Sequence, residues 1–177
     1  PLLLSSAASD VYKRQEVMTG ILCSGASMVP VPNTATPEAQ RNMLLDSAVK
    51  GLFVSDQYRN AALEHFMDIP SIRANLRFAL ETACEQFHDH TAWANTFDAS
   101  SPNVHMAFDE EYDILYSSGT TGIPKGIIHS HLARNLLISG TEKMEFEGGV
   151  VLTSTPLYSN TTITTWWPSV WVGATQV

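Results

Sequence analysis

Residues 112–126 read YDILYSSGTTGIPKG, and this stretch carries the strongest structural signal in the sequence. Residues 112–118 hold a run of aromatic and aliphatic side chains, which predicts a β-strand. Residues 119–126 combine glycines with a proline and a lysine, which predicts a loop. Residues 127–129 are again extended in character, and residues 132–138 have helical spacing. The sequence therefore predicts a strand, a glycine-rich loop, a short extended segment and a helix in this order.

The composition of this loop suits a polyphosphate held with few charges. Glycine allows left-handed backbone conformations and a close approach to an anion, and the loop has Gly119, Gly122 and Gly126. Successive N–H groups in such a turn form an anion-binding concavity. Lys125 adds one mobile positive charge, and Pro124 stiffens the loop. The hydroxyl groups that can meet phosphate oxygens belong to Ser117, Ser118, Thr120 and Thr121.

The loop differs from the P-loop of NTPases. That motif requires glycine directly before the lysine and serine or threonine directly after it. Here Pro124 and Gly126 flank Lys125, so the hydroxyl that would bind Mg²⁺ is missing from its place. A flexible surface loop rich in glycine, serine and threonine is the alternative interpretation. The order of the residues after a strand favours phosphate binding over it.

The overall composition limits the remaining classes of function. The chain has 177 residues, of which 44% are hydrophobic and 16% charged, and this predicts a packed domain rather than a disordered chain. Its formal net charge of −8 argues against a nucleic-acid binder. Cys23 and Cys84 lie far apart and suit neither a disulfide scaffold nor a metal site. Because apolar runs are too short for an integral membrane span, we expect a cytoplasmic protein.

Upstream of the loop, helical and extended patterns alternate. A buried helix stops at Gly25, residues 27–31 form a strand, and a second helix starts at residues 36–38 and ends at Gly51. Residues 51–55 form another strand, and a further helix has Asp56 at its cap. This alternation predicts an α/β fold with mainly parallel strands.

The apolar stripe within residues 72–87 favours a helix there. Downstream, residues 150–153 predict a strand, and residues 160–172 a helix that bends at Pro168. That helix holds three tryptophans, for which core packing is favoured over a role as the wall of a ligand pocket: Trp166, Trp167 and Trp171.

Residues 116–126, YSSGTTGIPKG, closely resemble the signature loop of the adenylate-forming (AMP-binding) enzymes. This superfamily includes acyl-CoA synthetases, peptide-synthetase adenylation domains and luciferases. Residues 25–55, the segment KGIIHSH (residues 125–131) and the segment TPLYSN (residues 155–160) resemble further family segments in the same order. The resemblance is greatest to fatty-acid–CoA ligases. It implies a strand near residues 77–80, where the residue pattern alone favours a helix.

The resemblance implies a two-step reaction. A carboxylic acid attacks the α-phosphate of ATP to give an acyl-adenylate and pyrophosphate, and a thiol, usually that of CoA, then takes the acyl group. It assigns the catalytic role to Lys125, Thr120 and Thr121, with Mg²⁺ bridging the phosphates near one of these threonines. The residues expected to hold the nucleotide are Ser117, Ser118, Gly119, Thr120, Thr121, Gly122, Lys125 and Gly126.

The family's acyl-site motif falls on Tyr158, Ser159 and Asn160, which are expected to bind the acid. Many CoA ligases have histidine at the position of Ser159 and glycine at that of Thr162, so this chain departs from them at both. The acid itself is open, with a fatty acid preferred. An adenylation domain that loads a carrier protein, and a nucleotide-binding module without catalysis, are the alternatives.

The remaining expectations concern the ends of the chain and its histidines. Residues 1–15 resemble a leader outside the fold, and residues 16–177 part of the large N-terminal domain of an adenylate-forming enzyme. We therefore expect the chain alone to be inactive. The segment His88-Asp89-His90 is more typical of a solvated helix end than of a metal site, so no metal ligand is predicted. His129 and His131 are expected to have structural roles.

Overall fold

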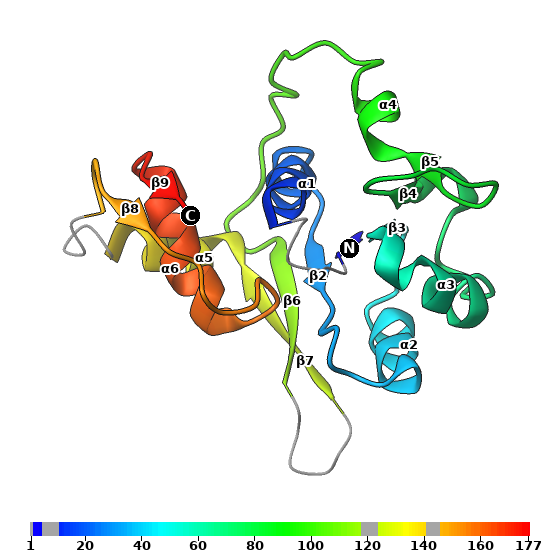
Figure 1. Ribbon diagram of the computed structural model, residues 1–177. Helices are drawn as coiled ribbons and strands as arrows, with labels where there is room; N and C mark the ends of the chain where they lie inside the picture. Colours follow the sequence, from blue (N-terminus) through cyan, green and yellow to red (C-terminus); the bar gives the residue numbers. More distant parts are fainter. Residues whose placement is uncertain (1, 5–10, 118–123, 141–145) are drawn as a thin grey trace.

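The structure, a computed structural model, describes residues 2–4, 11–117, 124–140 and 146–177 (Figure 1). Its helices are α1 (Val11–Cys23), α2 (Pro37–Asp46), α3 (Asp56–His65), the 3₁₀ turn η2 (Ala74–Leu76), α4 (His90–Ala94), α5 (His131–Gly140) and α6 (Asn160–Trp171). Its strands are β1 (Leu2–Leu4), β2 (Met28–Pro30), β3 (Gly51–Val54), β4 (Arg77–Ala79), β5 (His88–Asp89), β6 (Glu111–Ser117), β7 (Lys125–Ser130), β8 (Val150–Val151) and β9 (Thr175–Gln176).

The strands form a seven-stranded sheet in the order β5-β4-β3-β1-β2-β6-β7 and a separate two-stranded sheet, β8-β9. The neighbouring strands are parallel except β6 and β7, which form an antiparallel hairpin. This confirms the predicted α/β class with mainly parallel strands. The sheet includes Leu2–Leu4, and α1 begins at Val11, so parts of the segment expected to be a leader, residues 1–15, lie within elements of the fold.

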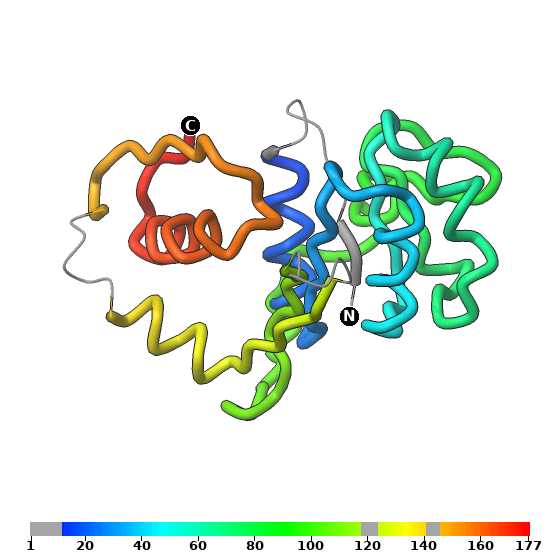
Figure 2. The backbone as a smooth tube through the Cα atoms, turned by 90° about the horizontal axis from the view of Figure 1, so that it is seen from below, coloured from blue at the N-terminus to red at the C-terminus, as the bar shows by residue number. Residues whose placement is uncertain are grey.

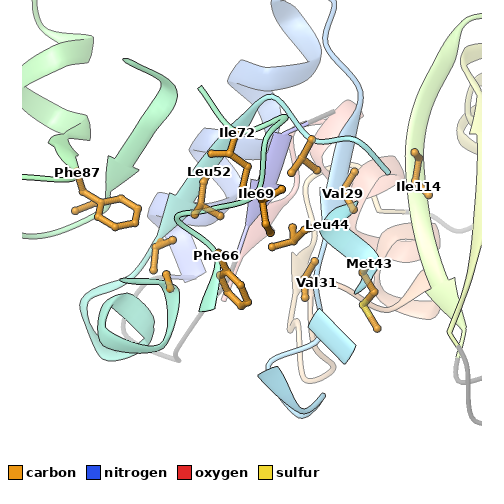
Figure 3. Close-up of a cluster of buried hydrophobic side chains, with 14 residues drawn as sticks. Val29, Val31, Met43, Leu44, Leu52, Phe66, Ile69, Ile72, Phe87 and Ile114 are labelled. Atoms are coloured by element: carbon orange, nitrogen blue, oxygen red, sulfur yellow. The ribbon is translucent and has the colours of Figure 1, made fainter. Parts of the chain in front are cut away.

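Helices cover both faces of the large sheet, and the strands bury side chains on both. On one face Val29, Leu52 and Val54 pack with residues of α2 and α3, such as Leu44 (Figure 3). On the other face the alternate residues of the same strands pack with α1 and α6: Met28, Phe53 and Phe78 from the sheet against Met18, Ile163 and Trp166. Because successive side chains of a strand point to opposite faces, short runs of apolar residues can fill both cores.

Two of the helix ends follow the sequence prediction closely. After α1 the amide of Ala26 donates to Ile21 O at 3.1 Å and that of Gly25 to Leu22 O at 3.0 Å, which are the two bonds of a Schellman motif. At the start of α2 the hydroxyl of Thr36 accepts from Ala39 N, and Pro37 is the first helical residue. The sequence thus specifies these ends through local chemistry.

Two other helix ends differ from the prediction. Helix α2 ends at Asp46 rather than at Gly51, because Ala48 takes a left-handed conformation with φ of 47° and Gly51 already begins β3. Helix α3 has Ser55 at its N-cap, and Asp56 is the first helical residue. The carboxylate of Asp56 accepts instead from Thr82 N and from Arg59.

The helix predicted within residues 72–87 is wrong. The segment contains η2 and β4, and the strand implied by the family resemblance is confirmed. The apolar residues there serve the two faces of a strand rather than one stripe of a helix: Ala79 belongs to the core beneath α2 and α3, whereas Phe78 and Leu80 belong to the core beneath α1. Sheet packing has therefore overridden a helical spacing.

The C-terminal part keeps its predicted order, with α5 and α6 side by side next to the hairpin (Figures 1 and 2). Pro168 lies inside α6. Trp166 and Trp167 are buried as predicted, but Trp171 is 78% exposed and its expected core position is wrong. Within the described residues no helix is long and apolar enough to span a bilayer.

The turn after α1 generates a first prediction, on Gly25. Its φ is +76°, and a Cβ there would lie 2.7 Å from Val104 Cγ1 and 2.9 Å from Met106 Sδ. Gly25→Ala should lower the free energy of unfolding by about 1–3 kcal/mol, measured by urea denaturation. The matched control is Gly20→Ala within α1, where the new Cβ would have no atom within 4 Å apart from its chain neighbours and the backbone of the helix itself. It should raise stability by about 0.5–1 kcal/mol. Equal effects of the two changes would contradict the turn geometry.

A second prediction concerns Tyr116, whose hydroxyl lies 2.7 Å from Asp46 Oδ2 and 3.0 Å from Met43 O. The phenol has one proton, which we assign to the nearer oxygen, that of Asp46, and this bond attaches the end of β6 to α2. Tyr116→Phe should cost about 1–2 kcal/mol of unfolding free energy, because the Asp46 carboxylate loses the donor of a half-buried tyrosine. Tyr12→Phe, at a side chain that is 66% exposed, is the control and should cost nearly nothing. A stability of Tyr116→Phe equal to that of the control would show that this attachment is absent in solution.

Candidate functional site

The hairpin of β6 and β7 presents the two ends of the glycine-rich loop side by side. Ser117 is the last residue of β6, Lys125 the first of β7, and the two are cross-strand partners. Both side chains are exposed. The other residues predicted to hold phosphate lie outside the described residues: Ser118, Gly119, Thr120, Thr121 and Gly122. A hydroxyl and an ammonium group at this point are donors that suit phosphate oxygens.

The register of the hairpin assigns its side chains to two faces. Cross-strand partners share a face, and so do residues two apart along a strand. One face therefore carries the pairs Ser117–Lys125, Leu115–Ile127 and Asp113–His129, and the other carries Tyr116–Gly126 and Ile114–Ile128. Leu115 packs in the core shared with α1 and α6, whereas Ile114 packs in the core shared with α2 and α3. The candidate phosphate ligands thus lie on the α6 side of the hairpin.

Gly126 has a different structural role from the one predicted. It lies within β7 and does not have a positive φ, so the predicted left-handed backbone there is wrong. A Cβ at this position would lie 3.0 Å from Ile114 Cγ2 and 3.2 Å from the ring of Tyr116. A side chain here would therefore press on Ile114 and the Tyr116 ring, and glycine leaves both their room beside β7. The ring also places its hydroxyl on α2, so that β6 is held just before the loop.

A fully buried ion pair lies in the middle of the same hairpin. Asp113 of β6 is 0% exposed and Arg134 of α5 is 3% exposed. Arg134 donates from Nε to Asp113 Oδ2 at 2.8 Å and from Nη2 to Asp113 Oδ1 at 2.9 Å. Such a bidentate contact fixes the relative orientation of the two groups as well as neutralising them. The pair therefore fastens α5 to the sheet at a defined angle.

His129 is a further hydrogen-bond partner of this carboxylate. Its Nδ1 lies 2.7 Å from Asp113 Oδ1 and 3.1 Å from Arg134 Nη2. Because a guanidinium can only donate, we assign the Nδ1 proton to the bond with Asp113, and the contact with Arg134 is not a hydrogen bond. Burial raises the pKa of the Asp113 carboxyl above its usual value, and the positive charge of Arg134 together with the hydrogen bonds from His129 and Arg134 offsets this rise only in part.

The predicted acyl-site residues form the turn that leads into α6. Ser159 is the N-cap of α6, Tyr158 is half-buried before it, and Asn160 is the first helical residue. The side-chain oxygen of Asn160 accepts from Arg134 Nη1 at 2.9 Å. The turn is therefore joined to the ion pair, and through it to the hairpin.

Thr162 stands where many CoA ligases have glycine, and its side chain makes hydrogen bonds within this turn. It is 1% exposed, and its hydroxyl donates to Pro156 O at 2.7 Å and lies 2.6 Å from the hydroxyl of Thr155. Thr155 then donates to Thr162, since each hydroxyl has one proton. A glycine could make neither bond, so the departure from the family pattern gives this turn its own internal support.

A large cavity of about 1110 Å³ lies at the other end of the hairpin. Its lining includes Tyr112 and His131, which are near the start of β6 and the end of β7. Trp167 and Trp171 of α6 also line it. The strand that separates Tyr112 from Ser117 spans about 17 Å at the usual rise per residue. The cavity is thus remote from the candidate phosphate ligands.

The segment His88-Asp89-His90, interpreted from the sequence as a solvated helix end, forms β5 and the first residue of α4, and its His90 is buried. Asp89 caps α4 by accepting from Ala92 N at 2.6 Å. His90 is buried against the rings of Phe53 and Phe78. We assign no described side chain as a ligand of Mg²⁺.

Sequence reasoning missed Asp113 and Arg134 and gave Asn160 a different partner. The sequence did contain a signal for Asp113. A carboxylate inside the apolar run of residues 112–116 must either reach solvent or have a buried partner. The position of the partner could not be read from the sequence. His129 has the structural role that was expected of it, as a partner of Asp113.

Two proteins of similar sequence are ligases by their names. The chain is 29% identical over 117 residues to the fatty acid–[acyl-carrier-protein] ligase ScoC of Streptomyces coeruleorubidus, covering 66% of this chain and 21% of ScoC. It is 27% identical over 172 residues to 4-hydroxybutyrate–CoA ligase 2 of Metallosphaera sedula, covering 92% of this chain and 31% of that ligase. The chain thus spans less than a third of either relative.

The fold agrees with that of solved structures. The inhibitor-bound N-terminal domain of FACL13 from Mycobacterium tuberculosis superposes with a TM-score of 0.79 and 22% sequence identity, over 99% of this chain and 42% of that domain. The sequence profile described as "AMP-binding enzyme" matches residues 14–177. This match extends over most of the sequence, and the chain therefore belongs to the AMP-binding enzyme family.

Proposed function

We propose that this chain is part of an ATP-dependent carboxylic acid–CoA ligase, which forms an acyl-adenylate and then transfers the acyl group to CoA. The observation that carries the proposal is the pairing of Ser117 with Lys125 at the two ends of the glycine-rich loop. Membership of the AMP-binding family supports it. The further loop residues that would complete the nucleotide site are Ser118, Gly119, Thr120, Thr121, Gly122 and Gly126.

The first chemical step determines what the loop must do. A carboxylate oxygen forms a bond to the α-phosphorus of ATP, the bond from that phosphorus to the oxygen bridging to the β-phosphate breaks, and pyrophosphate leaves with the electron pair. Both reactants are anions, so positioning and neutralisation dominate the barrier. Lys125 supplies a positive charge beside the departing pyrophosphate, and Ser117 supplies a hydroxyl donor. Thr120 and Thr121 join Lys125 as proposed catalytic residues, and Mg²⁺, when bound to the phosphates, supplies further neutralisation there.

The acid is proposed to bind next to the turn of Tyr158 and Ser159. This turn is connected to the hairpin face that carries Ser117 and Lys125, through Asn160 and Arg134. Four residues separate Lys125 from His129, which corresponds to about 13 Å along β7. The acid and the nucleotide can therefore approach each other from adjacent segments on one side of the hairpin.

A fatty acid is the proposed substrate class, and cytoplasm the proposed location. ScoC, by its name, is a ligase of fatty acids, although its acceptor is an acyl-carrier protein. The Metallosphaera sedula relative is by its name a CoA ligase for a short hydroxy acid. Cys23 and Cys84 are both free, which suits a reducing compartment.

The role of Lys125 is tested in the complete polypeptide that carries this chain. Lys125→Ala should lower the adenylation rate about 10²-fold or more, because a charge that stabilises the leaving group is lost. Acid-dependent ATP–pyrophosphate exchange over a panel of acids measures this step. Transfer to CoA from a preformed acyl-adenylate should be unchanged, since pyrophosphate has already left.

Lys50→Ala, at an exposed lysine before β3, is the charge-matched control and should exchange like the parent protein. An adenylation rate of Lys125→Ala equal to that of Lys50→Ala would contradict the role of Lys125. ATP binding by the parent protein without exchange for any acid would instead identify a nucleotide-binding module without catalysis.

The acceptor provides a separate prediction, because ScoC favours a carrier-protein ligase as the second candidate. With the acid that is activated best, CoA should yield the acyl thioester faster than a phosphopantetheinylated carrier protein at equal concentration. Mass spectrometry of both products measures the two rates. Exclusive loading of the carrier protein would replace the CoA ligase assignment with the second candidate and leave the adenylation step intact.

A further inference from the structure

A polar network with a buried ion pair at its centre joins four segments, about 13 Å along the hairpin from the ends of the glycine-rich loop. Asp113 lies in β6 before the loop, His129 in β7 after it, Arg134 in α5, and Asn160 at the first position of α6. The bonds run from His129 and Arg134 to the Asp113 carboxylate, and from Arg134 onward to Asn160. Each member comes from a different element, so the network fixes elements relative to one another rather than one element internally.

We propose that this network holds the acyl-site turn in register with the nucleotide loop, and that Asn160 is a positioning residue and not a group that binds the acid. The proposal rests on the proposed function, because it assigns a task to residues of the same site. It deepens that function by naming the contact that sets the distance between the two substrates.

The geometry of Arg134 is suited to this task. A guanidinium carries five N–H donors in one rigid plane, so contacts on its two sides have fixed relative directions. Arg134 uses Nε and Nη2 toward Asp113 and Nη1 toward Asn160. The planar guanidinium therefore fixes the start of α6 relative to β6.

The degree of burial excludes a direct catalytic role for the ion pair. Asp113 is 0% exposed and Arg134 3% exposed, so neither can touch a phosphate at the loop. Asp113 also lies four residues from Ser117, or about 13 Å along the strand. Asn160, in contrast, is exposed and directly follows Ser159, so among the described residues it is the member of the network that reaches the acyl-site turn.

Stability alone does not account for such a network. Apolar side chains of similar volume in place of a buried ion pair often give equal or greater stability. The present network adds the fixed directions that apolar packing lacks, and it directs them at the turn before α6. Since an acid must be in line with the α-phosphate to react, small displacements of this turn would slow the reaction.

The test uses Asn160, because replacement of Asp113 or Arg134 leaves an unpaired buried charge and unfolds many proteins. Asn160→Ala removes the acceptor for Arg134, whereas Asn160→Asp keeps a side-chain oxygen there and adds a charge that attracts the guanidinium. The control Asn135→Ala makes the same change as Asn160→Ala at an exposed asparagine beside Arg134. All are made in the complete polypeptide.

The two possible roles of Asn160 predict opposite orders of activity. If Asn160 is a positioning residue, Asn160→Ala should lower kcat/KM for the acid about ten-fold, and Asn160→Asp should restore it to nearly the parent value. The dissociation constant of a non-hydrolysable ATP analogue should not change. If Asn160 instead binds the acid, the new carboxylate repels the substrate and Asn160→Asp should be less active than Asn160→Ala. That order, or full activity of Asn160→Ala, would overturn the proposal.

A second measurement does not depend on activity. The amides of Thr162 and Ile163 donate to Ser159 O in the first turn of α6. Their hydrogen exchange should be several-fold faster in Asn160→Ala than in the parent protein, and unchanged in Asn160→Asp and Asn135→Ala. Equal exchange in all four proteins would overturn the network as a support of this turn. Accelerated exchange in a protein that activates no acid would retain the network and contradict only the proposed function.

Discussion

The carboxylate of Asp113, which is completely excluded from solvent in the middle of β6, is the constraint on which the C-terminal half of the structure depends. An ionised carboxylate in such a place costs several kcal/mol unless charged and hydrogen-bonding partners surround it. Arg134 and His129 supply these partners from α5 and β7. The need to pair this one group therefore determines where the helix after the hairpin must lie, and the same helix then contacts the start of α6.

The two faces of the hairpin formed by β6 and β7 have different roles. One face attaches the hairpin to the rest of the fold, and the other carries the proposed phosphate ligands. On one side the Tyr116 ring covers Gly126 and bonds to the end of α2, so the ends of the loop are attached to the parallel sheet and its helices. On the other side Ser117 and Lys125 are exposed, on the face of the hairpin that also carries Asp113 and His129. A loop whose two ends are held in this way loses less conformational freedom when it binds an anion, which is a form of preorganisation.

The parts of the fold that depend only on a few neighbouring residues could be predicted from the sequence. The Schellman turn at Gly25, the cap at Thr36 and the strand before the loop were all predictable, because each follows from a few neighbouring residues. The segment of residues 72–87 was not, because its apolar residues fit a helical stripe as well as the two faces of a strand, and the neighbouring strand β3 decides between them. The site shows the same division. A glycine-rich loop between two extended segments was predictable from composition, although Lys125 and Gly126, which were predicted within the loop, belong to β7. The bond from Arg134 to Asn160, in contrast, joins residues 26 apart and depends on the packing of two helices.

The buried ion pair also bears on the proposed nucleotide site, which lies in an acidic chain. The formal net charge is −8, but the Debye length is about 8 Å at physiological ionic strength, so most of these charges are screened from the loop. Asp113 lies about 13 Å from Ser117 along β6. Because it is buried, its charge is screened less than that of a surface carboxylate, yet Arg134 neutralises it at hydrogen-bond distance. The pair therefore contributes directional bonds while adding almost no net field at the loop. The charge that a nucleotide meets there is then that of Lys125, and an unpaired Asp113 would oppose it.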